Sequence, residues 1–293
     1  MAAAFGPAGT AESFRAMGYR KTIQVPQYLK RFGLGLYEYQ CGHGVRISEE
    51  AARAFGAEAA AQGIRLSVHA PYYISLSSVE AEKREKSVEY ILQTARAAHA
   101  MGADRIVVHS GSCARMGREE ALRLAADTLR RAQQALDGAG LSEIRICPET
   151  MGKFNQLGDL EEVLSLCRRE ERFLPCIDFG HLNARTLGGM NSREAFAVLL
   201  DRMEAMLGEE RARIFHAHFS KIEYTGQGGE KRHLTFSDTQ YGPEFAPLGE
   251  LIAKRGLSPR VICESAGTQT EDALAMQQCY QAFLTVPERE SGD

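Results

Sequence analysis

The sequence predicts a single (β/α)8 barrel, an α/β fold in which parallel strands form a closed ring and helices cover the outside. Short runs rich in β-branched residues alternate with longer amphipathic stretches along the chain, and eight such short runs are present. The length of 293 residues also fits, because one barrel domain commonly takes about 250 residues. No linker or low-complexity segment divides the chain. We therefore expect one barrel domain over residues 1–286 and a short polar tail over residues 287–293.

The expected strands are the short apolar runs, taken in chain order. They are Ala4–Gly6, Leu36–Gln40, Ile64–His69, Arg105–His109, Glu143–Pro148, Leu174–Phe179, Ile214–Phe219 and Arg260–Glu264. Helical periodicity predicts helices over Val79–Met101, Arg118–Leu136, Leu160–Arg169, Ser192–Met206 and Glu244–Lys254. Ser192 is the expected N-cap of the helix that it begins, and Gly102 is expected to end the helix whose last residue is Met101. The glycine-rich stretch Thr225–Gly229 lacks the P-loop pattern, and we expect a mobile loop there.

Composition and charge restrict the class of protein. An apolar fraction of 44% with 25% charged residues is typical of a soluble globular protein. No apolar run approaches the roughly 20 residues that cross a bilayer, and no secretory signal is visible, so we expect a cytoplasmic protein without a membrane partner. The seven cysteines form no C-x-x-C pair and are expected to be reduced and mostly buried. The net charge of −3 argues against strong non-specific binding to nucleic acid, although a local basic patch stays open.

Residues of types that can bind metals lie at or near the carboxyl ends of six expected strands. They are His69, His109, Glu149, Asp178, His216 and Glu264. The carboxyl ends of barrel strands surround one mouth, where active sites of this fold lie. A strand-end histidine taken singly is more often hydrogen-bonded than ligating. Three acids gathered at one mouth, however, raise each other's pKa unless a cation lies among them. Mixed imidazole and carboxylate donors suit Zn²⁺, Mn²⁺, Fe or Co, and we predict a divalent-metal site.

Six short sequence blocks surround the predicted metal ligands. They are H-A-P-Y at His69–Tyr72, H-S-G-S at His109–Ser112, P-E-T at Pro148–Thr150, D-x-x-H at Asp178 and His181, H-x-x-x-S-K at His216–Lys221 and C-E-S at Cys263–Ser265. These blocks, in this order, resemble the endonuclease IV family of abasic-site endonucleases, within the xylose-isomerase-like TIM-barrel superfamily. The resemblance runs from about Ile64 to Glu264. It implies a TIM-barrel hydrolase of DNA repair that uses two or three zinc ions to cleave the phosphodiester 5′ to abasic sites in DNA.

The resemblance also implies roles for individual residues. Its metal ligands would be His69, His109 and Glu149 for one ion, Glu149, Asp178, His216 and Glu264 for a second, and His181 and His233 for a third. The family has an aspartate two residues before the last histidine, where this chain has Lys231, and Glu230, Asp238 or His218 could compensate. His218 is otherwise expected to be a strand residue satisfied by its neighbours.

Roles in catalysis and substrate binding follow from the same resemblance. Glu149 and Glu264 are the expected catalytic residues. The expected substrate-binding residues are Tyr72, Tyr73, Lys221 and Arg232, which would face the phosphates and the flipped-out nucleotide.

A sugar isomerase or epimerase on the same scaffold is the alternative function. One Mn²⁺ or similar ion would then lie among Glu149, Asp178, His216 and Glu264, and the two glutamates would exchange a proton next to a carbonyl. His69 and His109 favour a multinuclear site, whereas Lys231 and the loop at residues 41–46, which differs from that of the endonucleases, favour the sugar enzyme. A third alternative is a barrel that binds a metal or metabolite without catalysis.

Overall fold

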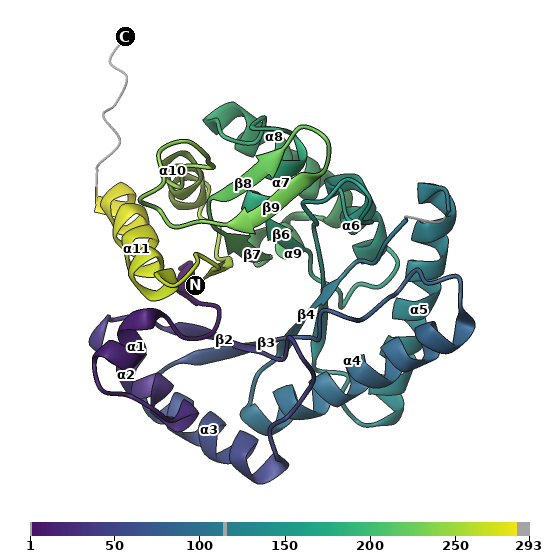
Figure 1. The fold of residues 1–293 in the computed structure, drawn as a ribbon, viewed down its shortest axis with the longest axis horizontal. Helices are drawn as coiled ribbons and strands as arrows, with labels where there is room; N and C mark the ends of the chain where they lie inside the picture. Colours follow the sequence, from purple (N-terminus) through teal and green to yellow (C-terminus); the bar gives the residue numbers. More distant parts are fainter. Residues whose placement is uncertain (1, 114–115, 286–293) are drawn as a thin grey trace.

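The computed structural model describes residues 2–113 and 116–285 and contains an eight-stranded parallel barrel. The strands are β1 (Ala4–Pro7), β2 (Leu36–Gln40), β3 (Arg65–His69), β4 (Arg105–His109), β5 (Arg145–Glu149), β6 (Cys176–Asp178), β7 (His216–Phe219) and β10 (Arg260–Cys263). Their order is β1-β10-β7-β6-β5-β4-β3-β2, and a parallel bridge between Ala8 and Glu38 brings the two edges together. Figure 1 shows these strands around a common centre with the helices outside them. The predicted barrel is confirmed.

Helices connect the strands and cover the ring. They are α1 (Glu12–Ala16), the 3-10 helix η1 (Thr22–Gln24), α2 (Val25–Arg31), α3 (Glu49–Ala61), α4 (Ala81–Met101), α5 (Arg118–Gly138), α6 (Leu160–Cys167), α7 (Phe179–Arg185), α8 (Arg193–Leu207), α9 (Glu209–Arg213), α10 (Ala246–Lys254) and α11 (Gln269–Thr285). The Ser192 side chain accepts a hydrogen bond from the backbone N–H of Ala195, as expected of an N-cap. Gly102 follows α4 with a left-handed φ of 71°, which terminates that helix.

The glycine-rich stretch Thr225–Gly229, which the sequence predicts to be a loop, contains the turn of a hairpin. It joins β8 (Ile222–Thr225) to β9 (Gly229–His233), an antiparallel pair outside the barrel sheet. Gly229 has a φ of 74°, and a Cβ there would lie 2.3 Å from the Gly152 carbonyl oxygen, so only glycine fits. The hairpin therefore packs against the loop that follows β5. Its strands are too polar to give the alternating apolar pattern from which a strand is recognised.

The barrel interior is polar near the mouth, whereas the layer between strands and helices is apolar. Phe179, Phe196 and Phe215 are fully buried in that apolar layer. All seven cysteines are free thiols, and five of them are buried. Within the described ranges, no helix is long and apolar enough to span a membrane. The expected tail at 287–293 lies outside the described residues.

Candidate metal centre

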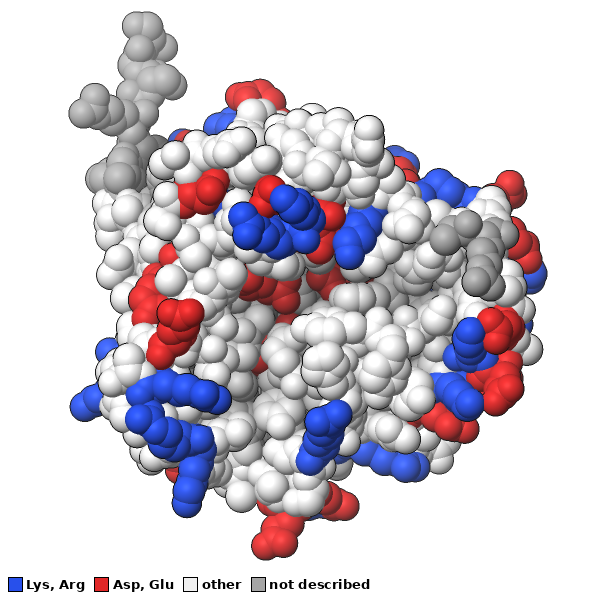
Figure 2. All heavy atoms as spheres, in the orientation of Figure 1, with Lys and Arg blue, Asp and Glu red and all other residues white. Residues whose placement is uncertain are grey.

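The carboxyl mouth of the barrel gathers most of the residues that the sequence predicts to bind metal. His69, His109, Glu149 and Asp178 are the last residues of β3, β4, β5 and β6, and Glu264 follows β10 directly. The parallel register places His109 opposite Glu149 on neighbouring strands. In Figure 2, acidic atoms lie in a hollow near the middle of the molecular face, below basic side chains that lie over the β8–β9 hairpin.

The first group of possible ligands is formed by His69, His109 and Glu149. The Nε2 atoms of both histidines lie 3.3 Å from Glu149 Oε2. His69 Nδ1 lies 2.7 Å from the Ala70 carbonyl oxygen. Because a carbonyl can only accept, Nδ1 carries the proton, and His69 Nε2 faces the carboxylate with a lone pair when the ring is neutral. A cation between Nε2 and the carboxylate would satisfy both, so this group fits a metal ion.

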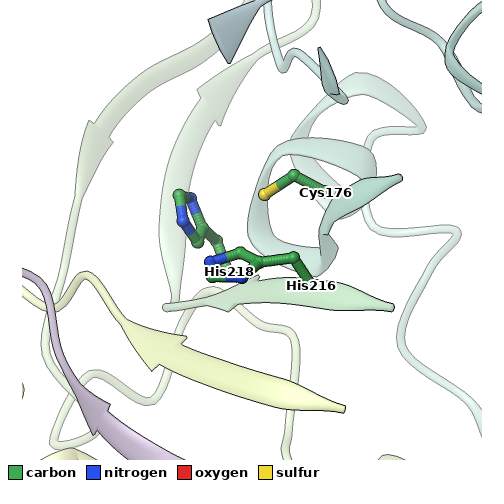
Figure 3. A group of neighbouring side chains, drawn as sticks. All are labelled: Cys176, His216 and His218. Atoms are coloured by element: carbon green, nitrogen blue, oxygen red, sulfur yellow. The ribbon is translucent and has the colours of Figure 1, made fainter. Parts of the chain in front are cut away.

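The second group contains Glu149, Asp178, Glu264 and His218, so His218 stands where the sequence indicated His216. His218 Nδ1 lies 3.0 Å from Glu149 Oε1 and 3.5 Å from Glu264 Oε2. His216 lies deeper, with Nε2 3.0 Å from Glu38 Oε2. Residues two apart on a strand face the same side, so both histidines of β7 point inward, and the later one is nearer the carboxyl mouth. Figure 3 shows both side chains next to Cys176 of β6.

The third group brings His181 of α7 together with Glu230 and His233 of β9. His181 Nε2 lies 3.5 Å from Glu230 Oε2, and the two histidine rings are 5.5 Å apart. Lys231 turns outward and pairs with Glu223 at 2.5 Å. Glu230 is therefore the carboxylate of this group, one position before Lys231.

The electrostatics of the described residues favour a cation at this mouth. Burial raises the pKa of Asp178 to about 6, an effect that the nearby Glu264 and Glu149 reinforce and His181 opposes. Burial alone would lower the pKa of His181, but Asp178, Glu230 and Glu149 outweigh it and raise that pKa to about 9. Asp178 Oδ2 is buried and accepts no hydrogen bond from the described residues, although it lies 3.1 Å from His181 Nδ1 as an ion pair. A buried carboxylate beside further acids is what a divalent ion would stabilise.

The four expected substrate-binding residues differ in their availability. Tyr72 is 52% exposed, and its ring stacks 5.5 Å from that of His109 at the mouth. Tyr73 is 50% exposed and packs against Tyr90. Lys221 is buried, with Nζ 2.5 Å from Glu244 Oε1, and Arg232 donates to Glu223. The tyrosines are thus open to a ligand, whereas both cations already contact carboxylates.

The sequence pattern does not single out Glu38. It offers Glu230 and His218 only as possible substitutes for the missing aspartate, and otherwise predicts His218 to be a strand residue satisfied by its neighbours. The distance of His218 from the end of β7 is the signal from which it could have been found, because Phe219 is the last residue of that strand.

Fold and residue groups together define the class: a (β/α)8 barrel whose carboxyl mouth carries mixed histidine and carboxylate groups. The chain belongs to the xylose isomerase-like TIM barrel family, whose sequence pattern matches residues 26–280. The resemblance to endonuclease IV, which was recognised from the short blocks, is confirmed within this family.

Similar proteins include both candidate classes of enzyme. An uncharacterized protein of Methanocaldococcus jannaschii is 34% identical over 94% of this chain and 96% of its own length. A probable endonuclease 4 of Mycoplasma pneumoniae is 30% identical, but the match spans only 53% of this chain and 52% of that relative. Endonuclease IV of Thermus thermophilus superposes with a TM-score of 0.67 at 20% identity, over 90% of this chain and 94% of that one. The 3-keto-D-glucoside 4-epimerase of E. coli gives 0.68 at 15% identity, over 97% and 100%. At these identities the two structures show the shared fold alone.

Proposed function

We propose that this protein is a divalent-metal-dependent phosphodiesterase that cleaves DNA 5′ to abasic sites. Among the described residues four groups could bind a metal ion, and the observation that supports this function is that three of them, those of histidines and carboxylates alone, lie next to one another. Glu149 belongs to the first and second groups, and its Oε1 lies 3.5 Å from Nδ1 of His181 in the third. A sugar isomerase needs only the second group, so the other two would have no role in it.

The ligands proposed for the ions are the members of these groups. They are His69, His109 and Glu149; Glu149, Asp178, His218 and Glu264; and His181, Glu230 and His233. Imidazole and carboxylate donors favour Zn²⁺, with Mn²⁺ as the other candidate. Bound ions would supply Lewis-acid stabilisation for the negative charge that develops on the phosphoryl oxygens.

The side chains of the mouth have separate proposed roles in the reaction. The Glu264 side chain is 16% exposed, whereas that of Glu149 is 1% exposed, so Glu264 is the carboxylate able to take a proton from an attacking water. Glu149 holds His69, His109 and His218 in place through contacts of 3.0–3.3 Å. The exposed ring of Tyr72 offers a stacking surface for the nucleotide beside the missing base.

The alternative function is a sugar isomerase or epimerase. The contacts of the two basic residues favour it, because Lys221 and Arg232 already pair with Glu244 and Glu223. In that enzyme Glu149 and Glu264 would exchange a proton at a carbon next to a carbonyl.

Cleavage of a duplex with one abasic-site analogue tests the proposed function. Zinc-loaded protein is expected to nick the strand 5′ to the lesion, and Glu149→Gln is expected to abolish nicking. Glu161→Gln is the control, since this exposed glutamate pairs with Arg202 and belongs to none of the three groups, and it should retain activity. Absence of nicking by metal-loaded protein would overturn the proposal, and turnover of a keto-sugar by the same preparation would establish the alternative.

A further inference from the structure

Glu38 is a carboxylate in the interior of the barrel, beneath the proposed metal centre. It occupies the third position of β2 and is completely buried. Its Oε1 lies 3.0 Å from His218 Nε2, and its Oε2 lies 3.0 Å from His216 Nε2. Ser67 Oγ donates to Oε2 at 2.8 Å, and Gln40 Nε2 donates to Oε1 at 3.3 Å. Glu38 thus touches His218 on the side opposite the proposed metal ligands.

The cost of burying this carboxylate indicates that it has a role. A fully buried charge is strongly destabilising unless other groups compensate for it. Within residues 2–113 and 116–285, no lysine or arginine forms an ion pair with Glu38, and its ionic partners are the two imidazoles of β7. A neutral apolar side chain would fill the same position at lower cost, so packing alone does not explain a glutamate there.

The two ring nitrogens of His218 face different surroundings. Nδ1 faces Glu149 and Glu264, whereas Nε2 faces Glu38. A histidine that binds a metal through one nitrogen must carry its proton on the other, and a carboxylate beside that second nitrogen keeps the proton there. The contact between Nε2 and Glu38 Oε1 is an ion pair without hydrogen-bond geometry. The negative charge of Glu38, 3.0 Å away, nevertheless attracts a proton onto Nε2, and so favours the tautomer in which Nδ1 presents a lone pair to the mouth.

We propose that Glu38 is a positioning residue, which together with Ser67 and His216 orients His218 toward the metal centre. This inference rests on the metal centre of the proposed function. His216 completes the arrangement because its Nε2 contacts the second oxygen of Glu38 and fixes the plane of that carboxylate. The role of His216 in this proposal is thus to hold Glu38 and not to bind the metal.

The same residues allow a competing interpretation, in which the deep layer itself binds a metal. Cys176, His216 and His218 lie close enough for one ion, as Figure 3 shows. That ion would require a thiolate ligand, whereas the positioning role requires none. Cobalt-substituted protein separates the two, because a thiolate ligand produces a charge-transfer band in the absorption spectrum. We expect no such band, and its appearance in wild type together with its loss in Cys176→Ser would overturn the proposal.

The main test is the zinc affinity of Glu38→Gln, measured by competition with a chelator. We expect about 10–100-fold weaker binding, the usual effect of removing a group that holds a metal ligand from behind. Glu162→Gln is the control, since Glu162 is also a buried glutamate but belongs to none of the three groups. Its zinc affinity should match wild type. Ser67→Ala removes one hydrogen-bond donor to Glu38 and should weaken zinc binding about tenfold. It replaces Glu38→Gln as the test if that variant does not fold.

The possible outcomes are distinct. If wild type binds no zinc, the proposed metal centre fails, and the positioning role fails with it. If wild type binds zinc and neither Glu38→Gln nor Ser67→Ala weakens binding, only the positioning role is refuted. Equal weakening in Glu162→Gln would attribute the effect to general destabilisation and also refute that role.

Discussion

Replacing Glu230 by glutamine is expected to remove one metal ion per chain. Glu230 is the carboxylate in the group with His181 and His233, and its Oε2 lies 3.5 Å from His181 Nε2. Loss of a supporting residue behind a metal ligand typically weakens binding by about 10–100-fold. Loss of the group's anionic donor should therefore weaken binding of this ion by at least about 100-fold, or about 2.8 kcal/mol.

Elemental analysis after dialysis against buffered zinc measures this effect directly. The free zinc concentration is set between the dissociation constants of wild type and Glu230→Gln for this ion. Wild type is then expected to retain three ions and Glu230→Gln two. Lys231→Gln is the matched control at the adjacent position, because Lys231 is 55% exposed and pairs with Glu223. It should retain all three ions. Equal zinc content in Glu230→Gln and wild type, or a loss in Lys231→Gln, would refute the assignment of Glu230.

Three further predictions concern the stability of the scaffold. Glu162→Gln should cost about 1–3 kcal/mol at pH 7 because the carboxylate accepts two backbone N–H groups and pairs with Arg118. Burial alone would raise the pKa of Glu162, but Arg118 and those N–H groups lower it below 4.5, so this cost should disappear as pH falls through the lowered folded-state pKa. An equal cost in urea unfolding at pH 7 and pH 3 would contradict this assignment. Phe196→Ala, at a fully buried ring, should cost about 3–5 kcal/mol in the same assay, and a loss below about 1 kcal/mol would count against it. Gly229→Ala should destabilise the protein by more than about 1 kcal/mol, because the new Cβ would meet the Gly152 carbonyl. It should also weaken zinc binding by displacing the hairpin, and unchanged zinc affinity would show that the hairpin does not support the metal centre.

The barrel could be predicted from the sequence because its strands are local apolar runs. Each of β3, β4 and β5 ends at a ligand candidate, so the mouth residues His69, His109 and Glu149 follow from the fold class alone. The sequence pattern indicates His216 rather than His218 for the second group, since both face inward on one short strand. Only the position of the strand end relative to the mouth distinguishes them.

The third group and Glu38 depend on contacts that sequence spacing does not specify. A register shift between Glu223 and Tyr224 changes the pairing in the β8–β9 hairpin, so the spacing of Glu230 and His233 cannot be read as that of a regular strand. Glu38 meets Ser67 and His216 from positions 29 and 178 residues away along the chain. Contacts between residues so far apart in the sequence depend on the closed barrel and cannot be inferred from local sequence patterns.

Anomalous diffraction from crystals of the zinc-loaded protein would locate the ions directly. We predict three peaks, one beside His69 and His109, one within the group that contains His218, and one beside His181 and Glu230. A single peak among Glu149, Asp178, His218 and Glu264, with the other groups metal-free at saturating zinc, would contradict the trinuclear centre and establish the arrangement expected of a sugar isomerase.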